Sequence, residues 1–382
     1  MKRAVNLFYL FLAVLTGCTS VPSTEDSVVA LKHKCLEGIK VENVVYAIKG
    51  NDTLTVDIYT DPSADANVQR PLLIYLYGGG FESGTRFDGS SDLVNFVPYL
   101  VKEYGYVGAA MDYRLEFAKA RKEGRVPADL PATDLDSPEF VCCQEVVHEI
   151  THANLAAVED LMDLTTFMIG LADKYGIDTK KIIAVGSSAG ALTCLGAEYC
   201  IANGREVAKT HLPEGFNYAC IVPMAGGIYT RYGKEVKFAE KPCPMMLFHG
   251  DADELVPYRR YEMPQYGATF HGSREIADVL AAMRVPYCMY TVEGGNHVIN
   301  GSPMVTSRED IHAFIKRTID LKTPWTVEIV EKSLTVPHDY QWIANEHILP
   351  LIKEHPEYAS QLASNDEKDD PHRPTNSEHD MK

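Results

Sequence analysis

Five residues between a strand-like run and a helix-like run place the tightest constraint on how this chain can fold. Residues 186–190 read Gly-Ser-Ser-Ala-Gly, after the apolar run 181–185 and before the helix formers of 191–198. A strand that turns into a helix through Gly-x-Ser-x-Gly exposes the serine oxygen at the top of a sheet. Because glycine lies two residues before and two residues after Ser188, the motif predicts this serine as a nucleophile. A glycine-rich turn without chemistry is the alternative for the motif alone.

A serine nucleophile needs a histidine base and an acid that orients the base. At a turn of this kind the chain order is serine, then acid, then histidine. Of the strand-like runs that follow Ser188, the one at 244–249 leads into Asp251 and Asp253, and the next, at 286–291, leads toward His297. Loops beyond the carboxyl ends of parallel strands carry the active sites of open sheets. We expect Asp253 rather than Asp251 as the acid, and His297 rather than His249 as the base, since His249 precedes the acid.

A glycine run upstream predicts the site that holds a negatively charged oxygen. The apolar run 71–77 leads directly into three glycines at 78–80. Glycine lets the backbone turn its N–H groups toward one point, and acyl transfer builds negative charge on a carbonyl oxygen that such groups stabilise. The expected donors are the N–H groups of Gly79, Gly80 and Ala189.

With these motifs the chain resembles the α/β-hydrolases of the esterase/lipase type, similar to carboxylesterases that carry His-Gly-Gly-Gly-Phe and Gly-x-Ser-Ala-Gly. Further matching pieces are residues 111–114, 157–160 and 175–178, and the resemblance covers roughly residues 40 to 320. It implies an α/β-hydrolase fold, a mostly parallel twisted sheet with helices on both faces, and ester-type acyl chemistry. The chain departs from the family at Tyr77, where a histidine is usual.

The pattern along the chain agrees with one large catalytic domain. Strand-like and helix-like runs alternate, which predicts a largely parallel sheet covered by helices. The 382 residues are 46% hydrophobic, enough for one well-buried core. We expect five segments: a lipoprotein signal peptide at 1–17, a tether at 18–38, the catalytic domain at 39–322, a C-terminal extension packing on the domain at 323–360 and a disordered tail at 361–382.

The N-terminal residues predict export and a lipid anchor. Lys2 and Arg3 precede an apolar run at 4–15, which is too short to span a membrane as a helix. The Leu-Thr-Gly-Cys that ends at Cys18 resembles a bacterial lipobox and implies cleavage before Cys18 and lipidation of its thiol. An ordinary signal peptide with an incidental cysteine is the alternative. Thr19 after the cysteine, by resemblance to other lipoproteins, favours the outer over the inner membrane of the bacterial envelope.

The net charge of −17 restricts which binding partners this protein can have. It argues against nucleic acid, whose phosphates would repel such a chain. We expect a small-molecule or carbohydrate ester as substrate, membrane contact only through the anchor, and no cofactor. The oligomeric state is left open by the sequence.

One motif points to different chemistry. His148-Glu149-Ile150-Thr151-His152 matches His-Glu-x-x-His, which on a helix can bind zinc. A catalytic zinc needs a third protein ligand, and Ala172 stands where a thermolysin-like spacing would require glutamate. We therefore expect a solvated helix start and no metal.

Together these features predict a serine carboxylic-ester hydrolase. By analogy with surface esterases, acetylated or feruloylated polysaccharide is the expected substrate, an inference that the fold family alone does not establish. A serine peptidase on the same fold and a non-catalytic binding lipoprotein are the alternatives.

Overall fold

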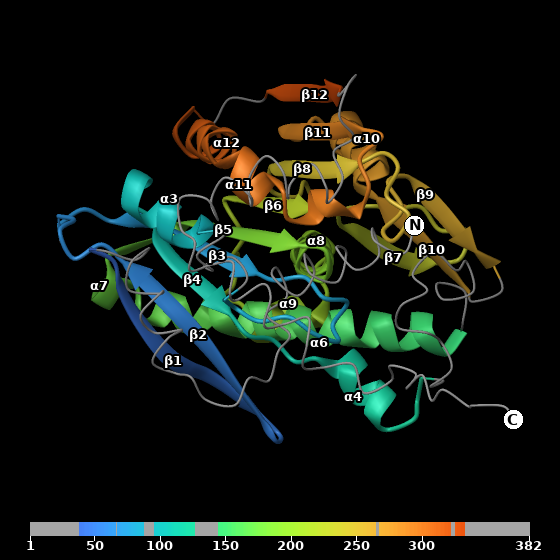
Figure 1. The fold of residues 1–382 in the computed structure, drawn as a ribbon, viewed down its shortest axis with the longest axis horizontal. Helices are drawn as coiled ribbons and strands as arrows, with labels where there is room; N and C mark the ends of the chain where they lie inside the picture. Colours follow the sequence, from blue (N-terminus) through green and yellow to red (C-terminus); the bar gives the residue numbers. More distant parts are fainter. Residues whose placement is uncertain are drawn as a thin grey trace, which may run out of the picture.

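A large mixed sheet forms the centre of the computed structural model (Figure 1). The structure describes residues 38–65, 67–87, 95–126, 144–264, 267–321 and 325–332. Within these residues the sheet has nine strands: β1 Lys40–Lys49, β2 Asp52–Thr60, β3 Arg70–Leu76, β4 Val107–Met111, β5 Ile177–Ser187, β6 Cys220–Met224, β8 Met245–Gly250, β11 Tyr287–Glu293 and β12 Thr326–Lys332.

The strand order and directions define the fold class. Across the sheet the order is β1-β2-β4-β3-β5-β6-β8-β11-β12. Neighbours from β4 to β12 run parallel, and only the pairs β1–β2 and β2–β4 are antiparallel. The central strands are apolar throughout because helices cover both faces of a parallel sheet. The predicted α/β-hydrolase fold is confirmed.

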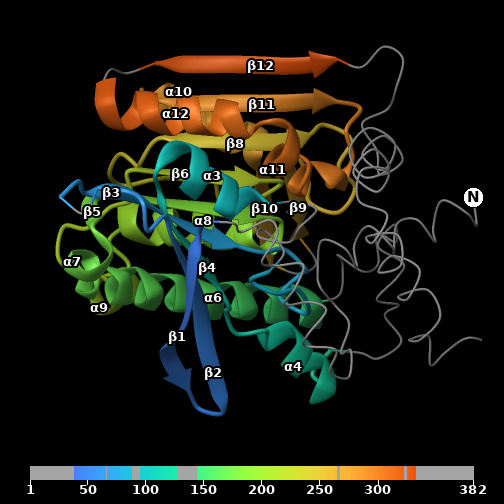
Figure 2. The ribbon, with the colours of Figure 1, turned by 60° about the vertical axis from the view of Figure 1, so that its left-hand side comes forward.

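Helices pack along both faces of the sheet (Figures 1 and 2). Helix α3 (Phe96–Tyr104) contacts α12 (Arg308–Leu321), and the long helix α6 (Gln144–Gly170) packs against α8 (Ala189–Ala202) and α9 (Glu206–His211). The remaining helical segments are α4 Glu116–Lys122, α7 Ala172–Tyr175, α10 Ser273–Met283, η2 His297–Asn300 and α11 Pro303–Thr306.

A second, three-stranded sheet lies beside the main one. It has the order β7-β10-β9, with antiparallel neighbours, and its strands are β7 Gly227–Arg231, β10 Ala268–Gly272 and β9 Arg260–Met263. Strand β7 begins three residues after β6 ends. The small sheet therefore extends outward from the carboxyl end of the main sheet, where an active site is expected.

Several expectations concern segments at the ends of the chain. Residues 326–332, from the expected C-terminal extension, form the edge strand β12, which pairs in parallel with β11. The signal peptide, the tether up to residue 37 with Cys18, and the tail at 361–382 lie outside the described residues. Of the helices described, none combines the length and the apolar character that crossing a bilayer requires.

A buried ion pair joins the sheet to α6. The Arg114 side chain, just after β4, donates to Asp160 at 2.9 Å and to Glu159 at 2.8 Å, while the Arg114 backbone N–H donates to Asp160 at 2.9 Å. Burial raises the pKa of the Asp160 carboxyl, and the bonds from Arg114 oppose this rise. These contacts hold the carboxyl end of β4 against α6 and account for two of the motif pieces, at 111–114 and 157–160.

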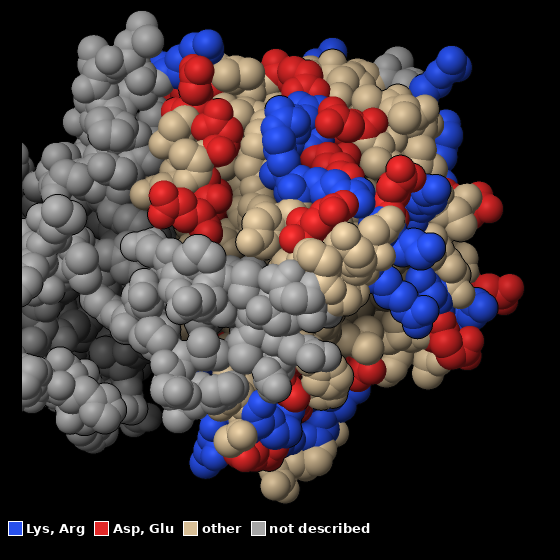
Figure 3. Space-filling view, turned by 90° about the vertical axis from the view of Figure 1, so that its right-hand side faces the viewer, with Lys and Arg blue, Asp and Glu red and all other residues tan. Residues whose placement is uncertain are grey.

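Charges of both signs share the surface. On the face in Figure 3, Lys and Arg side chains alternate with Asp and Glu side chains where residues are described. Among the ion pairs of the described residues, Arg274 pairs with Glu328 at 2.6 Å and with Asp278 at 2.8 Å. The acidic excess of the chain therefore does not produce a surface of a single sign on this face.

The side chain of Glu198 is an acidic group inside the core. Glu198 on α8 is fully buried, and its Oε1 accepts hydrogen bonds from the backbone N–H of Cys243 at 2.8 Å and from Asn217 at 3.3 Å. Its Oε2 has no partner within the described residues. Burial raises the pKa of Glu198 from 4.5 to about 7, so this carboxyl is partly protonated at neutral pH.

The raised pKa predicts a pH-dependent stability. The folded chain holds the Glu198 proton more tightly than the unfolded chain, so stability falls as pH rises from about 4.5 to about 7. Glu198→Gln removes this ionisation and should raise the stability at pH 8, relative to that at pH 4.5, by about 3 kcal/mol. Denaturant unfolding at both pH values measures it. The exposed Glu214→Gln is the control, and an equal pH response in both variants would contradict the prediction.

Candidate active site

The turn between β5 and α8 is sterically demanding. Ser188 has φ 49° and ψ −113°, a strained conformation for a residue other than glycine. A Cβ on Gly186 would lie 2.2 Å from the carbonyl oxygen of Gly190, and one on Gly190 would lie 2.4 Å from that of Leu76. The Ser188 N–H donates to the carbonyl of Met224 at 2.9 Å. Glycine at both positions therefore lets α8 begin against the sheet and holds Ser188 at the sheet's upper edge.

The structure brings Ser188, His297 and Asp253 into one hydrogen-bonded chain. Ser188 Oγ lies 3.0 Å from His297 Nε2, and His297 Nδ1 lies 2.7 Å from Asp253 Oδ2. The three residues come from the turn after β5, from η2 after β11 and from the loop after β8. Three neighbouring regions at the carboxyl ends of parallel strands thus meet at one point.

The environment of Asp253 determines the tautomer of His297. Burial by itself would raise the pKa of the carboxyl, but the interactions with His297 and His249 lower it well below its usual range. The backbone N–H groups of Leu255 and Val256 also donate to Asp253 Oδ1, each at 2.9 Å. An ionised carboxylate can only accept, so His297 Nδ1 donates and the Nε2 of the neutral ring accepts from the Ser188 hydroxyl.

Asp251 and His249, the two residues that the sequence disfavoured, are not members of the hydrogen-bonded chain of Ser188, His297 and Asp253. Asp251 is exposed, and its Oδ1 accepts from the backbone N–H of Gly294 at 2.6 Å. His249 is fully buried, and its Nε2 donates to the carbonyl of Val256 at 2.9 Å and lies 3.4 Å from Asp253 Oδ2. Asp251 joins two loops, and His249 lies beside the same Asp253 oxygen that His297 contacts.

The glycine loop lies against the nucleophile. A Cβ on Gly78 would lie 3.1 Å from Ser188 Cβ. In the described part of the chain, the backbone N–H groups of Gly79, Gly80 and Ala189 donate to no protein acceptor. The role of these three groups as oxyanion donors stays a prediction.

Tyr77 fills the place where the resembled family usually has histidine. Its ring stacks on Tyr113 with centroids 4.3 Å apart, and both side chains are buried. The Tyr113 hydroxyl donates to the Tyr77 carbonyl at 2.8 Å. The packing of the Tyr77 ring and the bond to its carbonyl therefore fix the residue that leads into the glycine loop.

One residue of the site was missed by sequence reasoning. Asn300 is buried at the end of η2; its Oδ1 accepts from Ser187 Oγ at 2.8 Å, and its side-chain amide donates to the His297 carbonyl. It thus links the end of β5, next to Ser188, to the turn that carries His297. No motif marks it, because the link joins positions 113 residues apart.

The His-Glu-x-x-His motif lies on α6. Its His148 and His152 are exposed, whereas Glu149 is buried and pairs with Arg125. Within the described residues no group of three or more His, Cys, Asp or Glu side chains is arranged to hold a metal ion. The structure therefore supplies no third ligand beside these two histidines among those residues.

No protein-family model and no curated protein matches the chain. Solved structures that resemble it include the apo form of Thermogutta terrifontis esterase 2, with 18% identity, a TM-score of 0.47, and coverage of 76% of this chain and 98% of that chain. The same esterase phosphorylated by paraoxon has 17% identity and a TM-score of 0.45, covering 75% and 95%. Likenesses at this level carry no argument about activity, and the strand order above defines the fold.

The Asn300 link predicts a measurable effect on the nucleophile. Asn300→Ala should slow the labelling of Ser188 by a serine-directed phosphonate about tenfold or more, because a displaced His297 ring activates the hydroxyl less well. The labelling rate is measured by mass spectrometry at saturating probe. Asn203→Ala, which removes a half-buried side-chain amide at the far end of α8, is the control. Labelling at the wild-type rate in Asn300→Ala would contradict the role.

Proposed function

We propose that this protein is a serine carboxylic-ester hydrolase. The observation that carries the proposal is the hydrogen-bonded chain from Ser188 through His297 to the buried Asp253. The same constellation performs acyl transfer on several unrelated folds, so its geometry and not its position in the sequence supports the assignment. The free N–H groups beside Ser188 support it further, because acyl transfer requires donors at the oxyanion.

In the first half of the reaction, the ester's acyl group moves to the enzyme. Ser188 Oγ attacks the ester carbonyl carbon while His297 Nε2 takes the hydroxyl proton. The N–H groups of Gly79, Gly80 and Ala189 hold the oxygen that becomes negative in the tetrahedral intermediate. When the carbon–oxygen ester bond breaks, the imidazolium returns the proton to the departing alcohol, and an acyl-serine remains. Asp253 keeps the ring oriented and stabilises its charged form.

In the second half, water takes the place of the alcohol. His297 Nε2 accepts a proton from the water, whose oxygen attacks the acyl carbon. The second tetrahedral intermediate collapses, the Ser188–acyl bond breaks, and His297 returns the proton to Ser188 Oγ. The carboxylic acid leaves, and no proton or electron is left over.

The proposed substrate class is a neutral acyl ester, with acetyl or feruloyl groups on polysaccharide as the specific proposal. A serine peptidase would use the same catalytic groups, since they also cleave amides. A panel of nitrophenyl esters, acylated xylo-oligosaccharides and aminoacyl amides separates the two. Turnover of the amides alone would overturn the esterase proposal, and turnover of small esters without the acylated saccharides would overturn the specific one.

Removing the nucleophile should abolish turnover. Ser188→Ala and His297→Ala should each lower kcat about a millionfold, because the three groups act as a unit. Asp253→Asn should cost about ten-thousandfold, since it favours the wrong tautomer of His297 but leaves the nucleophile in place. Steady-state hydrolysis of a nitrophenyl ester measures all three.

The neighbouring residues provide the controls. Ser187→Ala should keep activity within about tenfold, because it removes one hydrogen bond to Asn300 and leaves the Asn300 bond to the His297 carbonyl in place. Asp251→Asn should have a mild effect, since Asp251 contacts the Gly294 backbone. Full activity in Asp253→Asn, with loss in Asp251→Asn, would move the acid to the other position.

Activity should resist metal removal. The proposed steps use only side chains and backbone N–H groups, so incubation with a chelator should leave nitrophenyl ester turnover within about twofold. His152→Ala should stay within about tenfold, because His152 is exposed in the third turn of α6 and is none of the proposed catalytic groups. Stoichiometric zinc in the purified protein together with loss of activity on chelation would contradict this expectation.

A further inference from the structure

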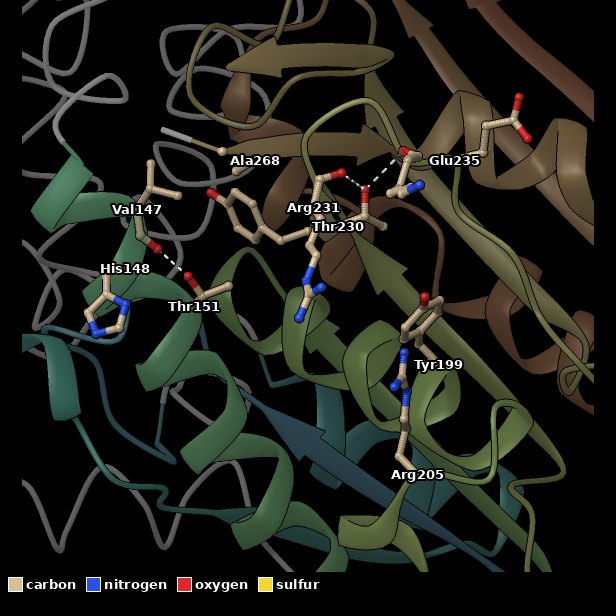
Figure 4. A pocket seen from close by; sticks show the side chains of 12 residues that line it. Val147, His148, Thr151, Tyr199, Arg205, Thr230, Arg231, Glu235 and Ala268 are labelled. Carbon is tan, nitrogen blue, oxygen red and sulfur yellow. Dashed lines mark hydrogen bonds between the residues drawn. The ribbon is translucent and has the colours of Figure 1, made fainter. Parts of the chain in front are cut away.

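A pocket on the side of the molecule has no role in the proposed reaction. It has a volume of about 700 Å³ and lies between the start of α6, the end of α8 and the strands β7 and β10 (Figure 4). Its lining comprises Val147, His148, Thr151, Tyr199, Arg205, Tyr229, Thr230, Arg231, Lys234, Glu235, Gly267 and Ala268. We refer to it below as the basic pocket.

The basic pocket carries cations without acidic partners. Arg205, Arg231 and Lys234 form no ion pair with any acidic residue in the described ranges. The one carboxylate of the lining, Glu235, pairs with Lys237 at 3.2 Å. The chain as a whole has a net charge of −17, whereas three cations without acidic partners make the surroundings of this cavity locally positive. Such a site attracts an anion.

The position of the cations suits a ligand that enters the cavity. In Figure 4 the Arg231 side chain extends between Thr151 of α6 and Tyr199 of α8. The Arg205 guanidinium lies 6.0 Å from the centre of the Tyr199 ring. Guanidinium groups bind carboxylate and sulfate oxygens through paired N–H donors. Two arginines at one cavity can therefore hold one anionic group from different sides.

The remaining lining favours a polar ring over a bare ion. A cavity of this volume is within the range that holds small organic ligands, well above the needs of an inorganic anion. Tyr199 and Tyr229 each pack one ring against a phenylalanine, at 5.8 and 4.8 Å between centroids. Burial raises the pKa of Tyr229 to about 12, so its hydroxyl stays protonated. Rigid tyrosines with polar tips suit hydroxylated rings.

The basic pocket is separate from the catalytic groups. Tyr199 lies eleven residues beyond Ser188, so about 16 Å of helix α8 separates the two positions. None of the lining residues belongs to the triad or to the expected oxyanion donors. Strand β7 connects the two regions, because it begins just after Met224, which accepts the Ser188 N–H, and ends at Arg231.

We propose that the basic pocket binds an anionic saccharide, a sugar that carries a carboxylate or a sulfate group. Arg205 and Arg231 hold the anionic group, Lys234 adds positive charge, and the tyrosines contact the ring. This binding does not depend on the proposed hydrolysis, because the pocket and the triad share no residue. On a polymer, the same binding would retain the protein beside its esters.

Calorimetric titration of the full chain tests the proposal, with Ser188→Ala as the host so that no ester is cleaved. The probes are digalacturonate, a sulfated disaccharide and neutral xylobiose. We expect one of the two anionic probes to bind, more weakly at higher salt, and xylobiose to bind at least tenfold more weakly. Whichever anionic probe binds more tightly identifies the anionic group.

Substitutions then locate the site. Arg231→Gln and Arg205→Gln should each lower the affinity about tenfold, because each removes a charge-assisted contact. Arg260→Gln, which removes an arginine outside the pocket that pairs with Glu262, should leave the affinity unchanged. Thermal unfolding checks that all three variants fold. The proposal is overturned if neither anionic probe binds, if xylobiose binds equally well, or if Arg260→Gln weakens binding as much as the pocket variants do.

Discussion

The close approach of helix α8 to the sheet is the constraint on which the rest of the site depends. Gly186 and Gly190 face each other and the carbonyl of Leu76 at distances that no side chain could occupy. The turn between them forces Ser188 into a positive φ, with its backbone N–H bonded to the carbonyl of Met224. Because β3, β5 and β6 all contact this turn, the position of the nucleophile is set by the centre of the sheet and not by a mobile loop.

A buried carboxylate provides the second fixed element. Four contacts offset the burial of Asp253: two backbone N–H groups at Oδ1, and His297 and His249 at Oδ2. An ionised acid is favoured in such a setting because donors surround it, and its lowered pKa keeps it an acceptor across neutral pH. The orientation of His297, and with it the accepting nitrogen toward Ser188, follows from this local electrostatic arrangement.

Glu198 is a buried acid whose pKa is shifted in the opposite direction from that of Asp253. It has two donors on one oxygen and none on the other among the described residues, and burial raises its pKa to about 7. Glu198 and Asp253 differ in the number of donors around the carboxylate. The protein therefore keeps one buried carboxylate ionised where chemistry is proposed and leaves another partly protonated in the core.

Local pattern in the sequence determined the class of fold and the candidate groups. The apolar runs before Gly78, before Ser188 and before Asp251 correspond to β3, β5 and β8, because buried parallel strands are continuously apolar. The order of serine, acid and histidine along the chain was also readable from the sequence, and it named Ser188, Asp253 and His297. These features depend on residues close together in the chain.

Tertiary structure alone decided the features that join distant residues. The link from Ser187 through Asn300 to His297, the support of Asp253 by His249, and the basic pocket between α6, α8, β7 and β10 have no local motif. The short strands of the small sheet were likewise not apparent, because each is stabilised by pairing with partners far along the chain. The sequence by itself determined which residues are chemically suited to the site, whereas the packing of α8 and the loops against the sheet decided which of them meet, because distances between remote positions exist only in the folded chain.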